Sequence, residues 1–238
     1  MNNKFKDSTC KDAKIDGESV TTIFSSGKTV GAILIAKMVD EGRLDYNEPI
    51  AKYWPEFAQN GKEKLTLADV MRHEAGMIKF NQRMEPEWLF TEGIKENKVG
   101  AVIEKETIDF PKSAKGYKRE YHAETRELIG NEIFRRVHPD GKTMGEYMRN
   151  DFGPEFGIDG IFLGILDQDK SRKVPFETIG NFQIMKEIWK GGDKVPTMMS
   201  TEFIKAAEED MKNVEAGHQH WPEFKKAAEP MVTFANIT

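Results

Sequence analysis

The sequence has little of several features that would point to particular classes of protein. Cys10 is the only cysteine among 238 residues, so no disulfide can form within the chain. The longest apolar runs, residues 30–36 and 161–166, are far shorter than the roughly 20 residues that span a bilayer, and no membrane span is expected. The first residues are mostly polar and lack the apolar core of a secretory signal. A cytoplasmic protein is therefore the default expectation.

An excess of basic residues is also missing. The chain has 35 Lys and Arg residues against 40 Asp and Glu residues, for a formal net charge of -5. Binding to a phosphate backbone needs the opposite balance, so nucleic acid is not an expected partner. With 38% hydrophobic and 32% charged residues, the chain can bury a core and still present a charged surface. Composition leaves the oligomeric state open.

Helical patterns are the most common signals along the chain. Apolar residues repeat at helical spacing from about 26 to 41, and Gly42 is suited to end that helix, which we expect to be buried nearly all round. A long helix is predicted from about His122 to Val137. Capping boxes at Thr66 with Asp69, and at Thr143 with Glu146, predict two further helix starts. Residues 201–213 have the pattern of an amphipathic helix.

Strand signals are few. They cover residues 22–24 and 161–166, the second following a group of glycines. The segments 80–115 and 168–183 are charged and weakly periodic, so we expect loops there. No internal repeat and no clean linker are found, and the length fits one large domain or two small ones.

One candidate for chemistry is the string Ser25-Ser26-Gly27-Lys28. A spacing of three on a helix places the Ser25 hydroxyl and the Lys28 amine on one face. A serine becomes a good nucleophile when a neighbouring base takes its proton, and a helix start favours the negative charge that develops. This spacing alone is weak evidence for a catalytic pair, because Ser8 and Lys11 have the same spacing. The same residues are also explained by a helix start, with Ser25 as its cap and Lys28 in solvent.

The same residues allow a second interpretation, because Gly27-Lys28-Thr29 is also the end of a nucleotide-binding P-loop. That motif requires glycine at position 22, where this chain has Thr22. No cofactor is expected. No metal is expected either, because Met77 stands where a zinc-protease helix begun by His73 would need its second ligand. His218 and His220 are more simply explained as solvated side chains.

Several segments, taken in order, resemble the serine β-lactamase and penicillin-binding-protein superfamily, including its class C β-lactamases. The resemblance covers about residues 16–164 and is most specific at 65–77, where the superfamily has a helix and a His-x-x-Gly turn. Tyr121-His122-Ala123, with the apolar helix after it, is similar to the second motif of the esterase and mitochondrial lactamase-like branch. Further matching segments are 23–29, 34–49, 53–57, 116–117 and 128–137.

The resemblance implies an α+β, β-lactamase/transpeptidase-like fold in a single domain over residues 1–238. In this fold a mainly helical lobe packs on a partial α/β lobe. It also implies roles for three residues: Ser25 as the nucleophile, Lys28 as its partner and Tyr121 as the base that takes or relays protons. The expected reaction is hydrolysis of a small ester, amide or β-lactam through an acyl-enzyme. If so, the Tyr121 phenol oxygen should lie within about 2.6 to 3.2 Å of Ser25 or Lys28.

Two departures from the superfamily pattern leave alternatives open. Ala123 stands where the second motif usually ends in asparagine, and no Lys-Thr-Gly or His-x-Gly strand is found for the third motif. The nearest string, Lys190-Gly191-Gly192, reads better as a loop. The C-terminal part of the superfamily domain is thus expected to be missing. A non-catalytic member acting as a binding or structural module is the main alternative, and a P-loop nucleotide binder a lesser one.

Overall fold

The computed structural model describes residues 16–110, 119–164, 166–174 and 233–236. These residues belong to one compact unit, apart from Val174. Predictions that concern Cys10, residues 190–192, 201–213, His218 and His220 lie outside the described residues. No helix in the described part of the chain is both long and apolar enough to cross a membrane.

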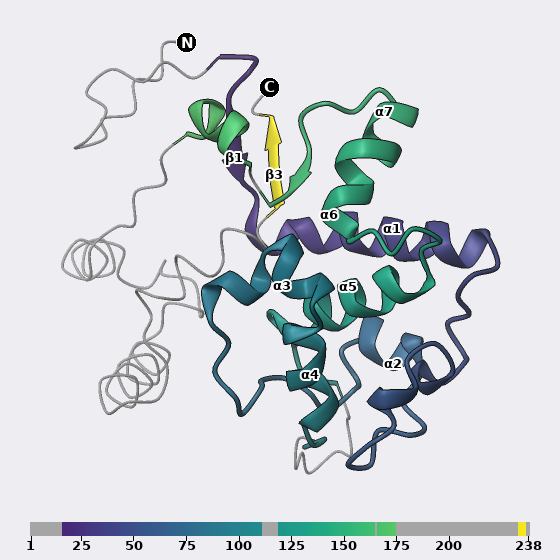
Figure 1. The fold of residues 1–238 in the computed structure, drawn as a ribbon. Coiled ribbons are helices and arrows are strands. Elements are labelled where there is room, and N and C mark those ends of the chain that lie inside the picture. The colour runs from purple at the N-terminus through teal and green to yellow at the C-terminus, as the bar shows by residue number, and fades with distance from the viewer. Residues whose placement is uncertain (1–15, 111–118, 165, 175–232, 237–238) are drawn as a thin grey trace, which may run out of the picture. The chain divides into compact units, whose positions relative to one another are not determined.

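Helices dominate the described residues, and Figure 1 shows how they are arranged. The α-helices are α1 (Lys28–Asp40), α2 (Leu67–Met71), α3 (Thr91–Lys95), α4 (Lys98–Lys105), α5 (Thr125–Val137), α6 (Met144–Tyr147) and α7 (Gly153–Glu155). The 3-10 turns are η1 (Phe24–Gly27), η2 (Ile50–Lys52), η3 (Pro55–Phe57), η4 (Pro86–Leu89) and η6 (Asp167–Arg172), and a π-turn, η5 (Met148–Phe152), joins α6 to α7.

A small antiparallel sheet lies at the start of α1 (Figure 1). Its strand order is β1 (Val20–Thr22), β3 (Thr233–Asn236) and β2 (Phe162–Leu163). The register pairs Val20 with Asn236 and Phe162 with Phe234. The strand predicted at 161–166 is confirmed in place and is shorter than expected. The strand predicted at 22–24 lies two residues earlier, because η1 begins at Phe24. Their partner, β3, brings the end of the chain beside the segment that leads to Ser25.

The helices form where the sequence carries start and stop signals. Thr66 and Asp69 bond reciprocally at the start of α2, and Thr143 and Glu146 do so at α6, so both predicted capping boxes are confirmed. Gly42 follows α1 with a φ of 70°, a left-handed conformation that glycine adopts without strain. The predicted helix over residues 122–137 begins later, at Thr125, because residues 121–124 approach the start of α1 instead.

Two predictions about helices are wrong. Helix α1 buries one face, through Gly31, Leu34, Ile35 and Met38, while Ile33 and Ala36 on the opposite side are exposed. The segment 80–115 was expected to be loops, yet it contains η4, α3 and α4. Helix α4 is short, and its burial at Val99, Val102 and Ile103 follows the three-and-four spacing that the charged residues around it obscure.

The hydrophobic core lies between α1, α5 and the turns around them. Helix α5 packs against α1, α2 and α4, so it is the central element of the described unit (Figure 1). Its fully buried members include Ile129, Ile133 and Phe134, and α1 contributes Leu34 and Ile35. The start of α5 is thereby fixed beside the start of α1, and this contact positions the residues of the candidate site.

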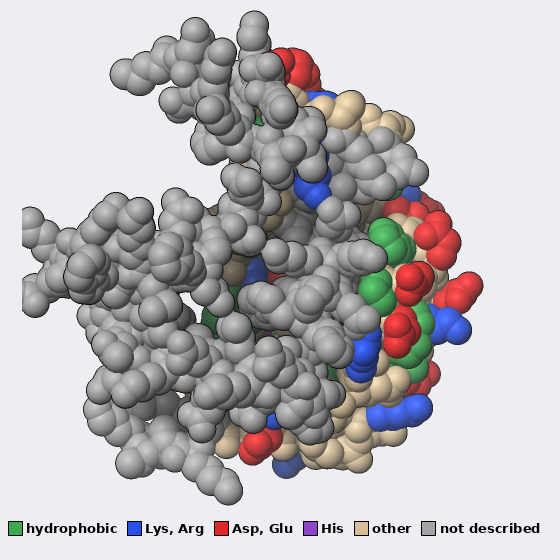
Figure 2. All heavy atoms as spheres, turned by 90° about the vertical axis from the view of Figure 1, so that its left-hand side faces the viewer, with side chains coloured by type: hydrophobic (Ala, Val, Ile, Leu, Met, Phe, Trp, Pro, Cys, Tyr) green, Lys and Arg blue, Asp and Glu red, His purple; other side chains and the backbone are tan. Residues whose placement is uncertain are grey.

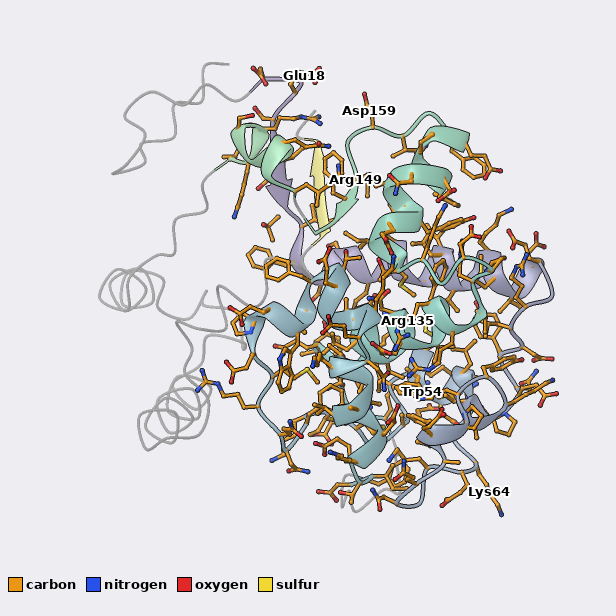
Figure 3. All side chains as sticks on the ribbon, in the orientation of Figure 1. Glu18, Trp54, Lys64, Arg135, Arg149 and Asp159 are labelled. Atoms are coloured by element: carbon orange, nitrogen blue, oxygen red, sulfur yellow. The ribbon has the colours of Figure 1, made fainter. Side chains whose placement is uncertain are left out.

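A cluster of buried polar side chains lies between α4 and α5. Arg136 stacks over the Trp54 ring at 3.8 Å, and Trp54 donates to Glu104 at 3.0 Å. Glu132 is fully buried and pairs with Arg135 at 2.7 Å and with Arg136. Figure 3 labels Trp54 and Arg135 in this region, between α4 and α5. Where described residues are visible in Figure 2, acidic and basic side chains lie interspersed.

Candidate active site

Ser25 lies in the 3-10 turn η1, directly before α1. The turn is closed by the Ser26 N–H, which donates to Ile23 O at 3.1 Å. Phe24 has a φ of 46°, in the left-handed region that a bulky side chain rarely adopts. Backbone strain of this kind gathers at functional sites, where the surrounding fold maintains it. Ser25 is thus held at a strained strand-to-helix junction.

The three residues predicted from the sequence lie together. Tyr121 Oη donates to Ser25 Oγ at 2.7 Å. Lys28 Nζ lies 5.3 Å from the centre of the Tyr121 ring and donates to Ala123 O at 2.5 Å. The expected distance between the phenol oxygen and Ser25 is therefore confirmed, while the chemical roles of these residues remain predictions.

The side chains of the site are open to solvent. Ser25 is exposed, and 53% of Tyr121 is accessible to solvent. A cavity of about 360 Å³ does not include Ser25 and is lined by Gly76, Ile78, Lys79, Asn81, Thr107, Ile108 and Asp109. The described residues therefore leave the hydroxyl open to solvent.

The electrostatics at Tyr121 make its phenolate more accessible than that of an ordinary tyrosine. Burial acts to raise the pKa of the Tyr121 phenol, but the hydrogen bond with Ser25, the Lys28 ammonium and the charge of Arg126 outweigh it and lower that pKa below its ordinary value of 10.0. A phenol with a lowered pKa is a better proton acceptor near neutral pH than an ordinary tyrosine. The arrangement can therefore take a proton from Ser25.

Two histidines hold Tyr121 in place. His73 follows α2 with a φ of 64°, and its ring centre lies 5.1 Å from that of Tyr121. Its Nδ1 accepts from the His122 N–H at 3.0 Å. The buried His122 ring accepts from the Met77 N–H at 3.1 Å through Nε2, so its Nδ1 carries the proton and donates to Glu120 O at 2.6 Å.

A network of ion pairs at the surface also joins the turn after α2 to the segment before α5. Glu74 accepts from Arg72 at 2.9 Å and from Arg119 at 2.8 Å. The Glu120 N–H donates to His73 O at 3.0 Å, beside these pairs. The turn after α2 and the segment before α5 are thus joined by backbone and side-chain contacts, which fixes where the Tyr121 ring can stand.

His73 must be neutral to accept the hydrogen bond from His122. Burial, with smaller contributions from the charges of Arg126, His122, Lys28 and Arg119, lowers the pKa of His73 from 6.5 to about 4. Burial likewise lowers the pKa of His122, partly offset by its contact with Glu120. Both shifts favour the neutral rings, which serve as hydrogen-bonding supports.

The sequence patterns assigned no role in the site to four residues of this region. His122, Arg126 and Glu127 were interpreted as ordinary helix residues, and His73 only as part of a turn. Arg126 is buried, and its Nη1 lies 3.3 Å from Glu127 Oε1. A signal for Glu127 was present in α1, where Gly31 interrupts an apolar helix. A glycine in a helix interior is costly and commonly marks close approach of another group.

No group of three or more metal-ligating side chains is found among the described residues. The His73 ring contacts the Tyr121 ring and accepts a hydrogen bond from the His122 N–H. The P-loop interpretation gains no support, because the Lys28 side chain is directed to the Ala123 carbonyl. The arrangement fits proton transfer to and from a serine hydroxyl.

Comparison with known proteins identifies a family and a relative. The family model described as Beta-lactamase matches residues 6–175. Esterase/beta-lactamase LipL of Mycobacterium tuberculosis is 32% identical over 157 residues, which are 66% of this chain and 34% of that protein.

Solved structures agree on the fold. A penicillin-binding protein homologue from Caulobacter crescentus is 26% identical with a TM-score of 0.63, covering 95% of this chain and 54% of that one. A family VIII carboxylesterase is 21% identical with a TM-score of 0.65, covering 98% and 56%. The chain spans about half the length of these proteins and about a third of LipL. It has a β-lactamase/transpeptidase-like fold, and it belongs to the beta-lactamase family.

Proposed function

We propose that this protein is a serine hydrolase that cleaves a small ester or amide through an acyl-enzyme on Ser25. The observation that carries the proposal is the 2.7 Å hydrogen bond between Tyr121 Oη and Ser25 Oγ, with the Lys28 side chain beside the same ring. A nucleophile, a base and a cation that favours the charged base are the parts that acyl transfer needs. Tyr121 lies 96 positions after Ser25 in the sequence, so chance proximity is a poor explanation of its contact.

The proposed reaction begins with Tyr121 in its phenolate form. Ser25 Oγ–H then donates to the phenolate, and the Ser25 oxygen attacks the substrate carbonyl carbon as its proton passes to Tyr121 Oη. Tyr121 returns that proton to the leaving oxygen or nitrogen as the carbon–leaving-group bond breaks. In the second half, Tyr121 takes a proton from water as the water oxygen attacks the acyl carbon. The bond between that carbon and Ser25 Oγ then breaks, the acid product leaves, and Tyr121 returns the proton to Ser25 Oγ.

Lys28 acts in this scheme as a fixed positive charge. Its hydrogen bond to Ala123 O holds the ammonium next to the Tyr121 ring. The cation lowers the energy of the phenolate, in line with the lowered pKa of Tyr121. The backbone N–H of Ser25, at the start of α1, would supply one donor to the oxyanion of the tetrahedral intermediate.

Esters are the proposed substrate class ahead of β-lactams and other amides. Ala123 has no side-chain amide to bind a substrate amide, and its carbonyl is occupied by Lys28. The exposed Ser25 suits small substrates with an accessible carbonyl. Esterases are among the relatives: LipL carries the names esterase and beta-lactamase together, and one similar structure is a family VIII carboxylesterase.

We place the site in one β-lactamase-related domain over residues 1–238, between a mainly helical lobe and a partial α/β lobe. The elements from α2 to η5 support the helical lobe, since between residues 44 and 152 the described part of the chain contains helices and turns and no named strand. The sheet of β1, β3 and β2, beside η1, supports the second lobe.

The test uses two adjacent serines. Hydrolysis of p-nitrophenyl acetate and butyrate, and of a chromogenic cephalosporin, is measured for the wild type, Ser25→Ala and Ser26→Ala. Both serines are exposed and lie in η1, so the variants are matched in site and size. We expect Ser25→Ala to lower ester turnover by at least about a thousandfold and Ser26→Ala to change it only a few-fold.

Two outcomes would overturn the proposal. Equal turnover by Ser25→Ala and the wild type would remove Ser25 as the nucleophile. A folded wild-type chain with no turnover of any of the three substrates would favour the alternative of a non-catalytic family member that binds its ligand without cleaving it.

A further inference from the structure

The cavity that does not include Ser25 lies between two segments of the chain, the turn after α2 and the residues after α4. Four of its lining residues come from the segment 76–81 and three from the segment 107–109. Its volume of about 360 Å³ is at the lower end of the range for ligand pockets, which is roughly 300 to 1,000 Å³. The space therefore suits a small molecule.

Backbone contacts fix the two segments against each other. The Asp109 N–H donates to Gly76 O at 2.8 Å. Gly76 has a φ of 65°, and a Cβ built there would lie 2.9 Å from the Phe110 ring and 3.3 Å from Asp109 O. A glycine allows this close approach, whereas a side chain would push the segments apart. The two sides of the cavity are thus held together without a ligand.

A buried carboxylate fixes the far end of the first segment. Glu106 Oε1 accepts from the backbone N–H groups of Asn81 and Gln82, at 2.7 and 3.3 Å. Its Oε2 accepts from Asn81 Nδ2 at 2.8 Å. Because the amide nitrogen of Asn81 is used in this way, its Oδ1 is the side-chain atom that remains to accept a hydrogen bond from a ligand.

The cavity lining carries one charge of each sign. Lys79 belongs to the first segment and Asp109 to the second, and both are exposed. In the described part of the chain, neither the Lys79 ammonium nor the Asp109 carboxylate forms an ion pair or a hydrogen bond, with the other or with a third group. Glu74 and Arg119, by contrast, are exposed charges that pair with each other at 2.8 Å. Both charges of the cavity are therefore available to a ligand.

The lining also has an apolar part. Ile78 and Ile108 are half-buried and come from opposite segments. Ile108 packs against the hydrophobic core, which fixes its side chain. Ligand pockets combine apolar contact area with a few polar groups that fix orientation, and this cavity has both.

We propose that the cavity binds a small zwitterion, an α-amino acid with an apolar side chain. Its carboxylate binds the Lys79 ammonium, its ammonium binds the Asp109 carboxylate and Asn81 Oδ1, and its side chain lies against Ile78 and Ile108. A simple anion or a simple cation would gain one of these contacts and be repelled by the other charge. The inference is independent of the proposed hydrolysis, because Ser25, Lys28 and Tyr121 do not line the cavity.

The first experiment compares leucine with two analogues that each lack one charge. Backbone amide signals of the full chain are followed by NMR during titration with leucine, with 4-methylpentanoate, which lacks the ammonium, and with 3-methylbutylamine, which lacks the carboxylate. We expect leucine to shift the signals of Ile78, Ile108 and Asp109 with a Kd on the order of 1 mM, and each analogue to bind at least about fivefold more weakly. No saturable shift with leucine, or equal binding of either analogue, would overturn the proposal.

The second experiment assigns each charge of the ligand to its partner. Lys79→Gln should weaken leucine binding about three- to tenfold and leave the binding of 3-methylbutylamine unchanged. Asp109→Asn should weaken leucine binding by a similar factor and leave the binding of 4-methylpentanoate unchanged. Leucine binding as strong in both variants as in the wild type would refute the site.

Matched controls separate this site from surface charge and from the Ser25 site. Lys64 and Asp159 are exposed, point away from the protein in Figure 3 and do not line the cavity, so Lys64→Gln and Asp159→Asn should bind leucine as the wild type does. Thermal melts check that every variant is folded. Ser25→Ala should also bind leucine normally, whether or not the protein cleaves esters. Loss of leucine binding in Ser25→Ala would place the ligand at the Ser25 site and contradict the inference.

Discussion

The hydroxyl of Tyr121 donates to the hydroxyl of Ser25 at 2.7 Å, although 96 positions separate the two residues in the chain. The contact depends on two packing interactions in the fold. Helix α5 lies against α1, and the His73 and His122 pair holds the residues before α5 against the turn after α2 (Figure 1). The tertiary fold, and no local sequence pattern, brings the phenol to the serine.

Tyr121→Phe tests the chemical value of that contact. The ring keeps its place beside His73 while the hydroxyl is lost, so we expect little change in stability and a drop in ester turnover of roughly 10²- to 10⁴-fold. Steady-state kinetics and a thermal melt check both parts. Tyr46→Phe, a half-buried tyrosine packed on the core, is the control and should keep its turnover. Equal turnover in Tyr121→Phe and the wild type would remove the catalytic role.

His73 predicts how stability depends on pH. Its pKa is about 4 in the folded protein and 6.5 in the unfolded chain, so the unfolded state binds more protons between these values. The free energy of unfolding should therefore fall as pH drops from about 6.5 to about 4, and His122, whose pKa is also lowered, adds to this trend. Urea unfolding at a series of pH values measures it.

His73→Asn separates the contribution of His73. Asparagine tolerates the positive φ at this position and cannot titrate. The variant should lose less stability over the same pH range than the wild type does. A pH dependence as steep as that of the wild type would mean that the His73 ring is not the group that takes up the proton.

Lys62 supplies a prediction about stability away from the site. It is fully buried, and its Nζ donates to Glu104 O at 3.0 Å and to Glu106 O, at the C-terminal end of α4. Burial lowers the pKa of Lys62, and the nearby carboxylates of Glu106, Glu63 and Glu104 oppose that effect. Lys62→Met leaves the two carbonyls without their donor and removes a cation that favours a helix C-terminus.

We expect Lys62→Met to lower the free energy of unfolding by about 1 to 3 kcal/mol, as measured by urea unfolding. The control is Lys64→Met, because Lys64 is exposed and points away from the protein (Figure 3). That variant should stay within about 0.5 kcal/mol of the wild type. Equal stability of the two variants would show that the Lys62 contacts contribute nothing.

Much of the local structure was predictable because its signals are short-range. The capping boxes at Thr66 and Thr143 and the stop at Gly42 follow from residues that act within one turn. Ser25 and Lys28 share a turn as well, so their proximity follows from spacing. The family resemblance was enough to predict Tyr121 as a site residue. Its position beside Ser25 could be known only from the tertiary structure.

Other features depend on neighbours that a sequence window does not contain. Helix α4 was missed because its apolar stripe is short and lies among charged residues that pair with α5, as Glu104 does with Arg136. Glu127 has the pattern of a solvated helix residue, and its burial follows from Gly31, a glycine far away in the chain. The positive φ of Phe24 and His73 is likewise imposed by tertiary contacts and not by residue type.

The most direct test of the account is covalent labelling of the nucleophile. The protein is treated with a fluorophosphonate, digested, and searched by mass spectrometry for the residue that carries the phosphonyl group. The account predicts a single adduct on Ser25, absent from Ser25→Ala, retained in Ser26→Ala and formed more slowly in Tyr121→Phe. A folded protein that gains no adduct, or that carries the adduct on Ser26 or another residue, would contradict it.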